Sequence, residues 1–496
     1  MHRLLPLALS LLAAAPASAL YVNSKGSGQV LLFPYYTTNA GQSTLLSVTN
    51  TTDRAKALRV AFREGYNSRE VLDFFVFLAP RDSWTATVFA QDDTDARIMT
   101  RDESCTAPDA SQWTAPFPGG GYQQVFLDFA YTGFGQDTGP VDSTRRREGH
   151  FEIVELAELE GQLAAAITGV HPPDCRPLQA IDPSSTNLKK PGGGLYGDFA
   201  VIDVAEGTLF GGRATAIDDY SQHLLINDTG SVPQYLAMAN NGNGRADAVL
   251  PAEDGSSTLS YSIASADGFS GSIRALDAVL MVDSLYGSMS REIGVGSHTE
   301  WVVTAPTKFL HTDPALLPSS QDGTILGPHP PFGEIFGSVY PGASCSRYTS
   351  SAHDREGRAV TFLQDPEFSA GPPGQLPQHA LCHATNVVHF SDRAADGTTP
   401  LLGSRLGSKL WNPVPAVATA SVRIDVGARP GTSALNLLPA GTIGPALRGL
   451  PLIGFEAVRY VNGNVTPGTL ANYTSASPLR TKTVCAKANG EPMPCP

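Results

Sequence analysis

The chain has 496 residues and a formal net charge of −13, and only 16% of its residues are charged. This balance argues against nucleic acid and anionic membrane surfaces as partners, since both attract clusters of Lys and Arg. The chain holds 49 glycines and 38 prolines, and this composition favours a loop-rich β protein over a helical one.

The first nineteen residues have the pattern of a secretory signal peptide. Arg3 precedes an apolar run over 4–15, and Ala17-Ser18-Ala19 matches a small-residue cleavage site. The run is too short to span a bilayer, and no later stretch reaches about 18 apolar residues. We therefore expect an exported chain without a transmembrane segment, in the periplasm, at the cell surface or outside the cell.

Residues 29–89 form the clearest series of short alternating strands. Turn signals rich in Gly, Asn, Asp and Pro separate them at a spacing of roughly 10–14 residues, which is typical of a sandwich or barrel. In the run 57–63, three apolar residues alternate with Arg59 and Arg63, which predicts a half-buried strand with both arginines on the other face. The run 71–78 is apolar on both faces and predicts a covered central strand.

A long loop insertion is expected around 91–150, because this passage is rich in Pro, Gly and Asp. Its basic run, Arg145 to Arg147, is expected to be a solvated loop. A short helix is expected over 158–167. Further strands are expected over 198–204, 208–217, 258–264, 278–284, 299–304, 386–390, 421–426 and 454–461.

These elements predict an all-β fold of antiparallel β-sandwich (Ig-like) modules with long loop insertions and little helix. The Pro-rich passage that begins at Pro306 is the preferred domain boundary. The expected organisation is a signal peptide over 1–19, one or more β-sandwich modules over 20–305, and a β-rich module over 306–496. An elaborated loop is the alternative explanation of the Pro-rich passage.

An even number of cysteines in an exported chain predicts disulfides. Six cysteines allow 15 pairings, and pairing between neighbours keeps each bridge inside one module. The expected bridges are Cys105–Cys175, Cys345–Cys382 and Cys485–Cys495.

Four segments resemble parts of uncharacterised exported proteins of proteobacteria. They are FPYY at 33–36, LSVTN at 46–50, WVVTAPTK at 301–308 and YVNGNV at 460–465. The resemblance runs along most of the chain. It implies export and a β architecture, and it carries no activity that could be transferred.

Calcium is the one cofactor that the sequence leaves open. Asp92, Asp93 and Asp95 supply the hard oxygen ligands that calcium prefers, although a solvated acidic turn is the favoured explanation. The run 241–247 contains Asn241, Asn243 and Asp247. It lacks the first and last ligands of a calcium loop, so a hairpin turn is the simpler interpretation of this run.

No catalytic residue can be assigned from the sequence. The chain has no Gly-x-Ser-x-Gly elbow, no P-loop and no dinucleotide fingerprint. His379, His383 and His389 could approach a zinc ion, but Cys382 between them is expected in a disulfide.

The first functional hypothesis is therefore an exported, non-enzymatic β-sandwich protein with a structural or adhesion-like role, whose partner is a protein or a glycan. One alternative is a secreted hydrolase acting on polysaccharide, which requires carboxylates such as Asp92, Asp102 and Asp128 to converge on a cleft. Another is a calcium-stabilised adhesin. An aromatic group could form a sugar platform or belong to the core: Tyr122, Phe126, Tyr131 and Phe134.

Overall fold

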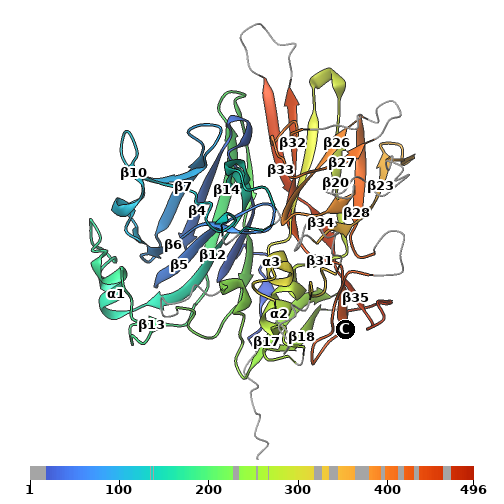
Figure 1. Cartoon of the computed structure of the whole chain (residues 1–496). Helices are drawn as coiled ribbons and strands as arrows, with labels where there is room; N and C mark the ends of the chain where they lie inside the picture. The colour runs from blue at the N-terminus through green and yellow to red at the C-terminus, as the bar shows by residue number, and fades with distance from the viewer. Residues whose placement is uncertain are drawn as a thin grey trace, which may run out of the picture.

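The computed structural model contains two β-sandwiches side by side, with a smaller layer of helices and a hairpin beside them (Figure 1). The prediction of an all-β fold of antiparallel sheets with little helix is confirmed, while the Ig-like character of the modules stays a prediction. Most of the predicted signal peptide lies outside the described residues, which are 18–133, 136–137, 139–226, 234–252, 255–265, 267–317, 327–333, 344–362, 379–391, 397–411, 418–428, 435–461 and 471–495.

The first sandwich is built from two antiparallel sheets. Sheet I has the order β1 (Tyr21–Val22), β16 (Thr215–Asp218), β3 (Val30–Thr37), β12 (Glu148–Leu159), β5 (Ala55–Glu64), β6 (Glu70–Leu78) and β9 (Cys105–Ala107), with β13 (Leu188–Lys189) beside β12. Sheet II has the order β10 (Ala115–Pro116), β11 (Tyr122–Val125), β8 (Arg97–Thr100), β7 (Ser83–Phe89), β4 (Ser43–Asn50), β14 (Leu195–Asp203) and β15 (Thr208–Arg213), with β2 (Ser27–Gly28) beside β14.

The second sandwich is built from two five-stranded sheets. Sheet III has the order β24 (Ala359–Val360), β23 (Thr349–Asp354), β28 (Thr419–Asp425), β20 (Ser284–Ser290) and β34 (Arg480–Lys482). Sheet IV has the order β27 (Gly407–Trp411), β26 (Thr385–Ser391), β21 (His298–Thr304), β32 (Ile453–Val461) and β33 (Asn472–Pro478). The pairing of β26 with β27 is parallel. The division at residue 306 stays a prediction, but β20 and β21 precede it and pair with strands that follow it.

One hydrophobic core runs from the first sandwich into the second. It fills the space between sheets I and II and also contains Val302, Val387 and Phe455 of sheet IV. The Phe455 ring lies 5.5 Å from the ring of Phe199 in sheet II, measured between centroids. A separate core around Trp301 fills the space between sheets III and IV. Sheet IV therefore buries apolar side chains on both of its faces, as a central layer does.

A third layer covers the outer face of sheet I. It contains α2 (Gly271–Leu280), α3 (Lys308–Thr312) and the hairpin of β17 (Arg245–Ala252) and β18 (Gly255–Ser262). Its hydrophobic cluster includes Leu20, near the start of the described chain, and Cys485, near its end. Cys485 belongs to β35 (Val484–Ala486), which lies in a small sheet with β29 (Leu437–Leu438), β30 (Ala446–Arg448) and β36 (Pro492–Met493). Both ends of the described chain thus meet in one cluster.

Two local predictions differ from the structure. The run 278–284, expected to be extended, holds the end of α2 and then β19 (Met281–Val282). Ser270 caps this helix by accepting a hydrogen bond from the backbone N–H of Ser272 at 3.2 Å, and Ile273, Leu276 and Leu280 have helical spacing. The helix expected over 158–167 is the shorter α1 (Gly161–Ala165), because β12 continues to Leu159.

The prediction that β5 is half-buried is wrong. Arg59 and Arg63 are only 1% and 2% exposed, because the third layer covers them. Arg63 contacts Glu152 at 3.1 Å and its guanidinium lies 4.1 Å from the centroid of the Phe309 ring. Arg59 contacts Glu70 at 2.6 Å. Pairing with carboxylates is what makes the burial of these cations tolerable.

The prediction that Arg145 to Arg147 form a solvated loop is also wrong, because Arg145 is 1% exposed. Its guanidinium binds both Glu64, with an ion-pair distance of 2.9 Å, and Asp137. The Glu64 carboxylate also accepts hydrogen bonds from three backbone N–H groups of the turn after β5, at 2.7 to 3.0 Å. Glu64 therefore fixes the turn and the arginine together.

The three disulfides pair as expected, with Cys105–Cys175, Cys345–Cys382 and Cys485–Cys495. They fit an exported protein, since disulfides persist in oxidising compartments. Among the helices of the described residues, none has the length and apolar character needed to cross a bilayer.

We expect the variant Glu64→Gln to lose about 3 kcal/mol of unfolding free energy, because it leaves part of the buried Arg145 charge unpaired. Urea denaturation followed by tryptophan fluorescence would measure the loss. The matched control is Asp53→Asn, which removes the exposed ion pair with Arg81 and should leave the midpoint unchanged. Equal midpoints for both variants would show that the Glu64 contacts do not hold the turn.

Candidate functional site

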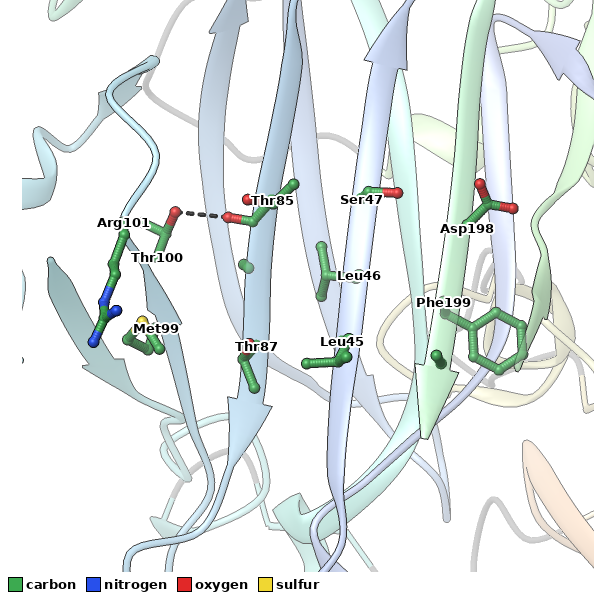
Figure 2. A pocket seen from close by; sticks show the side chains of 12 residues that line it. Leu45, Leu46, Ser47, Thr85, Thr87, Met99, Thr100, Arg101, Asp198 and Phe199 are labelled. Atoms are coloured by element: carbon green, nitrogen blue, oxygen red, sulfur yellow. Dashed lines mark hydrogen bonds between the residues drawn. The ribbon is translucent and has the colours of Figure 1, made fainter. Parts of the chain in front are cut away.

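A shallow hollow of about 450 Å³ lies on the outer face of sheet II. It crosses the four adjacent strands β8, β7, β4 and β14, and Figure 2 shows its lining side chains. The lining consists of Leu45, Leu46, Ser47, Thr85, Ala86, Thr87, Met99, Thr100, Arg101, Asp198, Phe199 and Ala200. We call this surface the sheet II hollow.

Strand alternation explains which side chains reach the sheet II hollow. On β4, Leu46 and Val48 are buried against sheet I, so Leu45 and Ser47 face outward. On β7, Trp84 and Ala86 are buried in the same way, and Thr85 is exposed. Leu46 and Ala86 border the hollow although their side chains belong to the core.

The register places two rows of side chains across the sheet II hollow. The first row is largely apolar and contains Met99, Thr87, Leu45 and Ala200 on successive strands. Leu45, which is 38% exposed, lies near its middle. No side chain of this row is aromatic. An apolar row on the solvent face of central strands contributes little to the packing of the sandwich, so it is available for contact with another molecule.

The second row is polar and contains Thr85, Ser47 and Asp198, and it continues beyond the hollow to Arg213 on β15. Arg101 follows the end of β8 at one side of the hollow, while Asp198 lies toward the other (Figure 2). Asp198 accepts a hydrogen bond from the Tyr196 hydroxyl at 3.0 Å. The guanidinium of Arg213 lies 5.5 Å from the centroid of the Tyr196 ring. The row thus presents a carboxylate and guanidinium groups beside the apolar one, which suits oriented docking of a partner.

The acidic group considered for calcium forms a hydrogen-bonded turn. Asp92 accepts hydrogen bonds from the Thr94 backbone at 2.8 Å and hydroxyl at 2.6 Å, and these bonds lower the pKa of Asp92. Asp95 pairs with Arg97, and Asp93 is exposed. The described residues contain no group of three His, Cys, Asp or Glu side chains arranged to hold a metal. Calcium binding at this turn stays a prediction.

The carboxylates considered for polysaccharide hydrolysis share no hydrogen-bond partner in the described part of the chain. Asp92 bonds to Thr94, while Asp102 accepts hydrogen bonds from the Thr85 and Ser104 backbones at 3.3 and 2.9 Å. The Asp128 side chain is exposed. None of the three lines the sheet II hollow.

The other candidate residues have structural surroundings. Phe126 and Tyr131 are fully buried in the core, Tyr122 is 39% exposed, and Phe134 lies outside the described residues. Burial lowers the pKa of His383 to about 3, and its ring packs against Tyr66. His379 and His389 are also buried, and Cys382 is in its disulfide.

The Asn241 loop is a turn that enters β17. The Asn241 side chain accepts a hydrogen bond from the backbone N–H of Asp247 at 2.7 Å and donates one to the Asp219 carbonyl at 3.0 Å. These bonds use both polar atoms of the Asn241 amide within the protein.

Sequence reasoning missed two buried carboxylates at the junction of the sandwiches. Glu300 accepts hydrogen bonds from the backbone N–H groups of Leu401 and Leu402 at 2.7 and 3.0 Å. Glu148 accepts one from the backbone N–H of Arg405 at 2.8 Å. We call residues 399–406 the junction loop. No local sequence pattern predicts these contacts, because the junction loop is more than 90 residues from either glutamate along the chain.

Comparisons with known proteins found no match to this chain among protein-family models, curated proteins or solved structures. The likeness to exported proteobacterial proteins therefore stays a prediction.

We expect calcium to leave the melting temperature unchanged within about 1 °C, because binding of an ion raises stability only where it finds a site in the folded state. Asp95 is already paired with Arg97 and Asp92 with Thr94. Differential scanning fluorimetry with calcium and with a chelator would test this. A rise of several degrees that disappears in Asp92→Asn would instead establish the calcium site.

We expect Glu300 to make stability depend on pH. Burial raises its pKa from 4.5 to about 7, so between these values the folded chain binds a proton that the unfolded chain does not. The contribution of protonated Glu300 to the free energy of unfolding is therefore fully present below about pH 4.5, and it is lost as the pH rises to about 7.

Urea titrations of the wild type and Glu300→Gln at several pH values would measure this effect. Between about pH 5 and 8 the wild type should lose at most about 3 kcal/mol more than the variant, which cannot titrate at this position. Parallel pH profiles for the two proteins would contradict the expectation.

Proposed function

We propose that the chain is an exported interaction protein that binds a protein partner through the sheet II hollow, without catalysing a reaction. The observation that carries this proposal is the apolar row of Met99, Thr87, Leu45 and Ala200 on the solvent face of central strands. Protein interfaces place apolar side chains at the centre of a contact patch and polar groups around them.

The composition of the sheet II hollow favours a protein over a glycan. Sugar platforms use exposed aromatic rings, and the apolar row has none. The Phe199 ring at the border of the hollow is 4% exposed and belongs to the core. The partner that fits this surface presents apolar side chains to Leu45 and Met99, and charged groups to Arg101 and Asp198.

The proposed location is the periplasm or the cell surface. Three disulfides support an oxidising compartment, and the pattern of residues 1–19 supports export. The rigid sandwich supports a role in adhesion or assembly, since a preformed surface loses little conformational entropy on binding.

The variant Leu45→Arg tests the proposal. It places a charge in the middle of the apolar row without entering the core, so it should weaken partner binding about ten-fold or more while the melting temperature stays the same. The probe is intact cells of the producing organism, and bound fluorescent protein would be measured by flow cytometry. The matched control is Val170→Arg, whose side chain is 40% exposed and outside the hollow.

Pretreatment of the cells identifies the chemical class of the partner. Binding to a protein should disappear after protease treatment and survive periodate oxidation of surface glycans. The opposite pattern would replace the protein partner by a glycan, and equal binding of Leu45→Arg and wild type would remove the sheet II hollow as the site.

A further inference from the structure

A second hollow, of about 630 Å³, lies in the other sandwich and is lined mostly by sheet III, with further residues from β32 and β33 of sheet IV. Its lining differs in chemistry from that of the sheet II hollow, because it contains serines, arginines, a histidine, a tyrosine and a glutamate. The lining consists of Tyr286, Gly287, Ser288, Ser351, His353, Ser421, Val422, Arg423, Glu456, Ser477, Pro478 and Arg480. We call this surface the sheet III hollow.

The register of sheet III aligns its charged groups in one row. Ser351, Arg423, Tyr286 and Arg480 lie on the successive strands β23, β28, β20 and β34. The Tyr286 ring is thus flanked by two arginines on the neighbouring strands. The guanidinium of Arg423 lies 5.4 Å from the centroid of this ring. The adjacent row contains His353, Ser421 and Ser288, and so adds further polar groups.

The charged side chains of the sheet III hollow differ in how many hydrogen bonds and ion pairs they make within the protein. The Glu456 carboxylate accepts a hydrogen bond from the Ser288 backbone at 2.6 Å, just beyond the point where β34 stops pairing with β20. Arg423 donates to Asp425 at 2.7 Å. The Arg480 side chain is exposed and makes no ion pair or hydrogen bond within the part of the chain that the structure describes, although its backbone pairs with β20.

The Arg480 guanidinium is thus an exposed cation without an ion-pair partner in the described chain, and it lies in one hollow with hydroxyl groups and the hydrogen-bonded Glu456 carboxylate. A guanidinium binds a carboxylate through paired hydrogen bonds. The exposed hydroxyls of Ser351, Ser421 and Ser477 lie in the same hollow and suit a ligand that is itself rich in hydroxyl groups. A sugar that carries a carboxylate combines both features in one molecule.

We propose that the sheet III hollow binds a uronic-acid saccharide, with its carboxylate on Arg480 and its hydroxyl groups on the surrounding serines. Arg423, held by Asp425 and Tyr286, is the second cation along the row. The site is separate from the sheet II hollow, so this inference does not depend on the proposed protein partner. Binding at the sheet III hollow would anchor the protein on an acidic polysaccharide, in addition to the proposed binding of a protein partner at the sheet II hollow.

The experiment is isothermal titration of the whole mature protein with short oligosaccharides of galacturonate and of mannuronate. The matched ligands are the same oligosaccharides with methyl-esterified carboxylates, and inorganic sulfate. The variant is Arg480→Gln. Its control is Arg358→Gln, which removes an exposed arginine from the turn between β23 and β24, paired with Asp354 outside the hollow.

We expect at least one acidic oligosaccharide to bind with a dissociation constant below about 1 mM, and esterification or Arg480→Gln to weaken binding about ten-fold. Arg358→Gln should change it less than about two-fold, and Leu45→Arg should leave it unchanged. The proposal is overturned if no acidic oligosaccharide binds, if the esters bind equally well, if sulfate binds as tightly as the saccharide, or if Arg480→Gln binds like the wild type.

Discussion

The structure depends on the pairing of charges under the third layer. Arg59 and Arg63 lie on the outer face of sheet I, where Glu70 and Glu152 neutralise them. An unpaired buried charge costs several kcal/mol. The third layer can therefore cover these two arginines only because both are paired with carboxylates. The Phe309 ring then packs on Arg63 and brings α3 against the sheet. Sheet I becomes an internal layer, which leaves the outer face of sheet II to meet other molecules.

The two sandwiches form one framework because polar and apolar contacts cross their junction. Phe455 of sheet IV packs into the core of the first sandwich. The junction loop is held from one side by Glu300 and from the other by Glu148, and the Gln42 side chain donates to the Leu401 carbonyl at 2.7 Å. These contacts join the two sandwiches, and the two hollows lie on different ones of them.

The strand pattern made the fold class predictable, because alternation such as that of Leu46 and Val48 reports which face of a strand is buried. The same alternation places Leu45 and Ser47 on the outer face of β4, so the sequence pattern predicts the orientation of these two lining residues of the sheet II hollow. The burial of Arg59, Arg63 and Arg145 was not, because their partners and covering layer come from distant segments. Whether a polar face is solvated or covered depends on tertiary contacts that local periodicity does not report. The order of the cysteines left 15 pairings open, and the correct one followed only from the assumption that each bridge stays inside one module.

The shared cluster at the two ends of the described chain has a consequence for the order of folding. Leu20 and Cys485 belong to the same hydrophobic cluster, so the cluster cannot close until the segment around Cys485 has reached Leu20. Strands such as β4 and β7 can associate long before that time. The folding chain must keep apolar surface exposed until the segment around Cys485 arrives, and it depends during that interval on protection from aggregation.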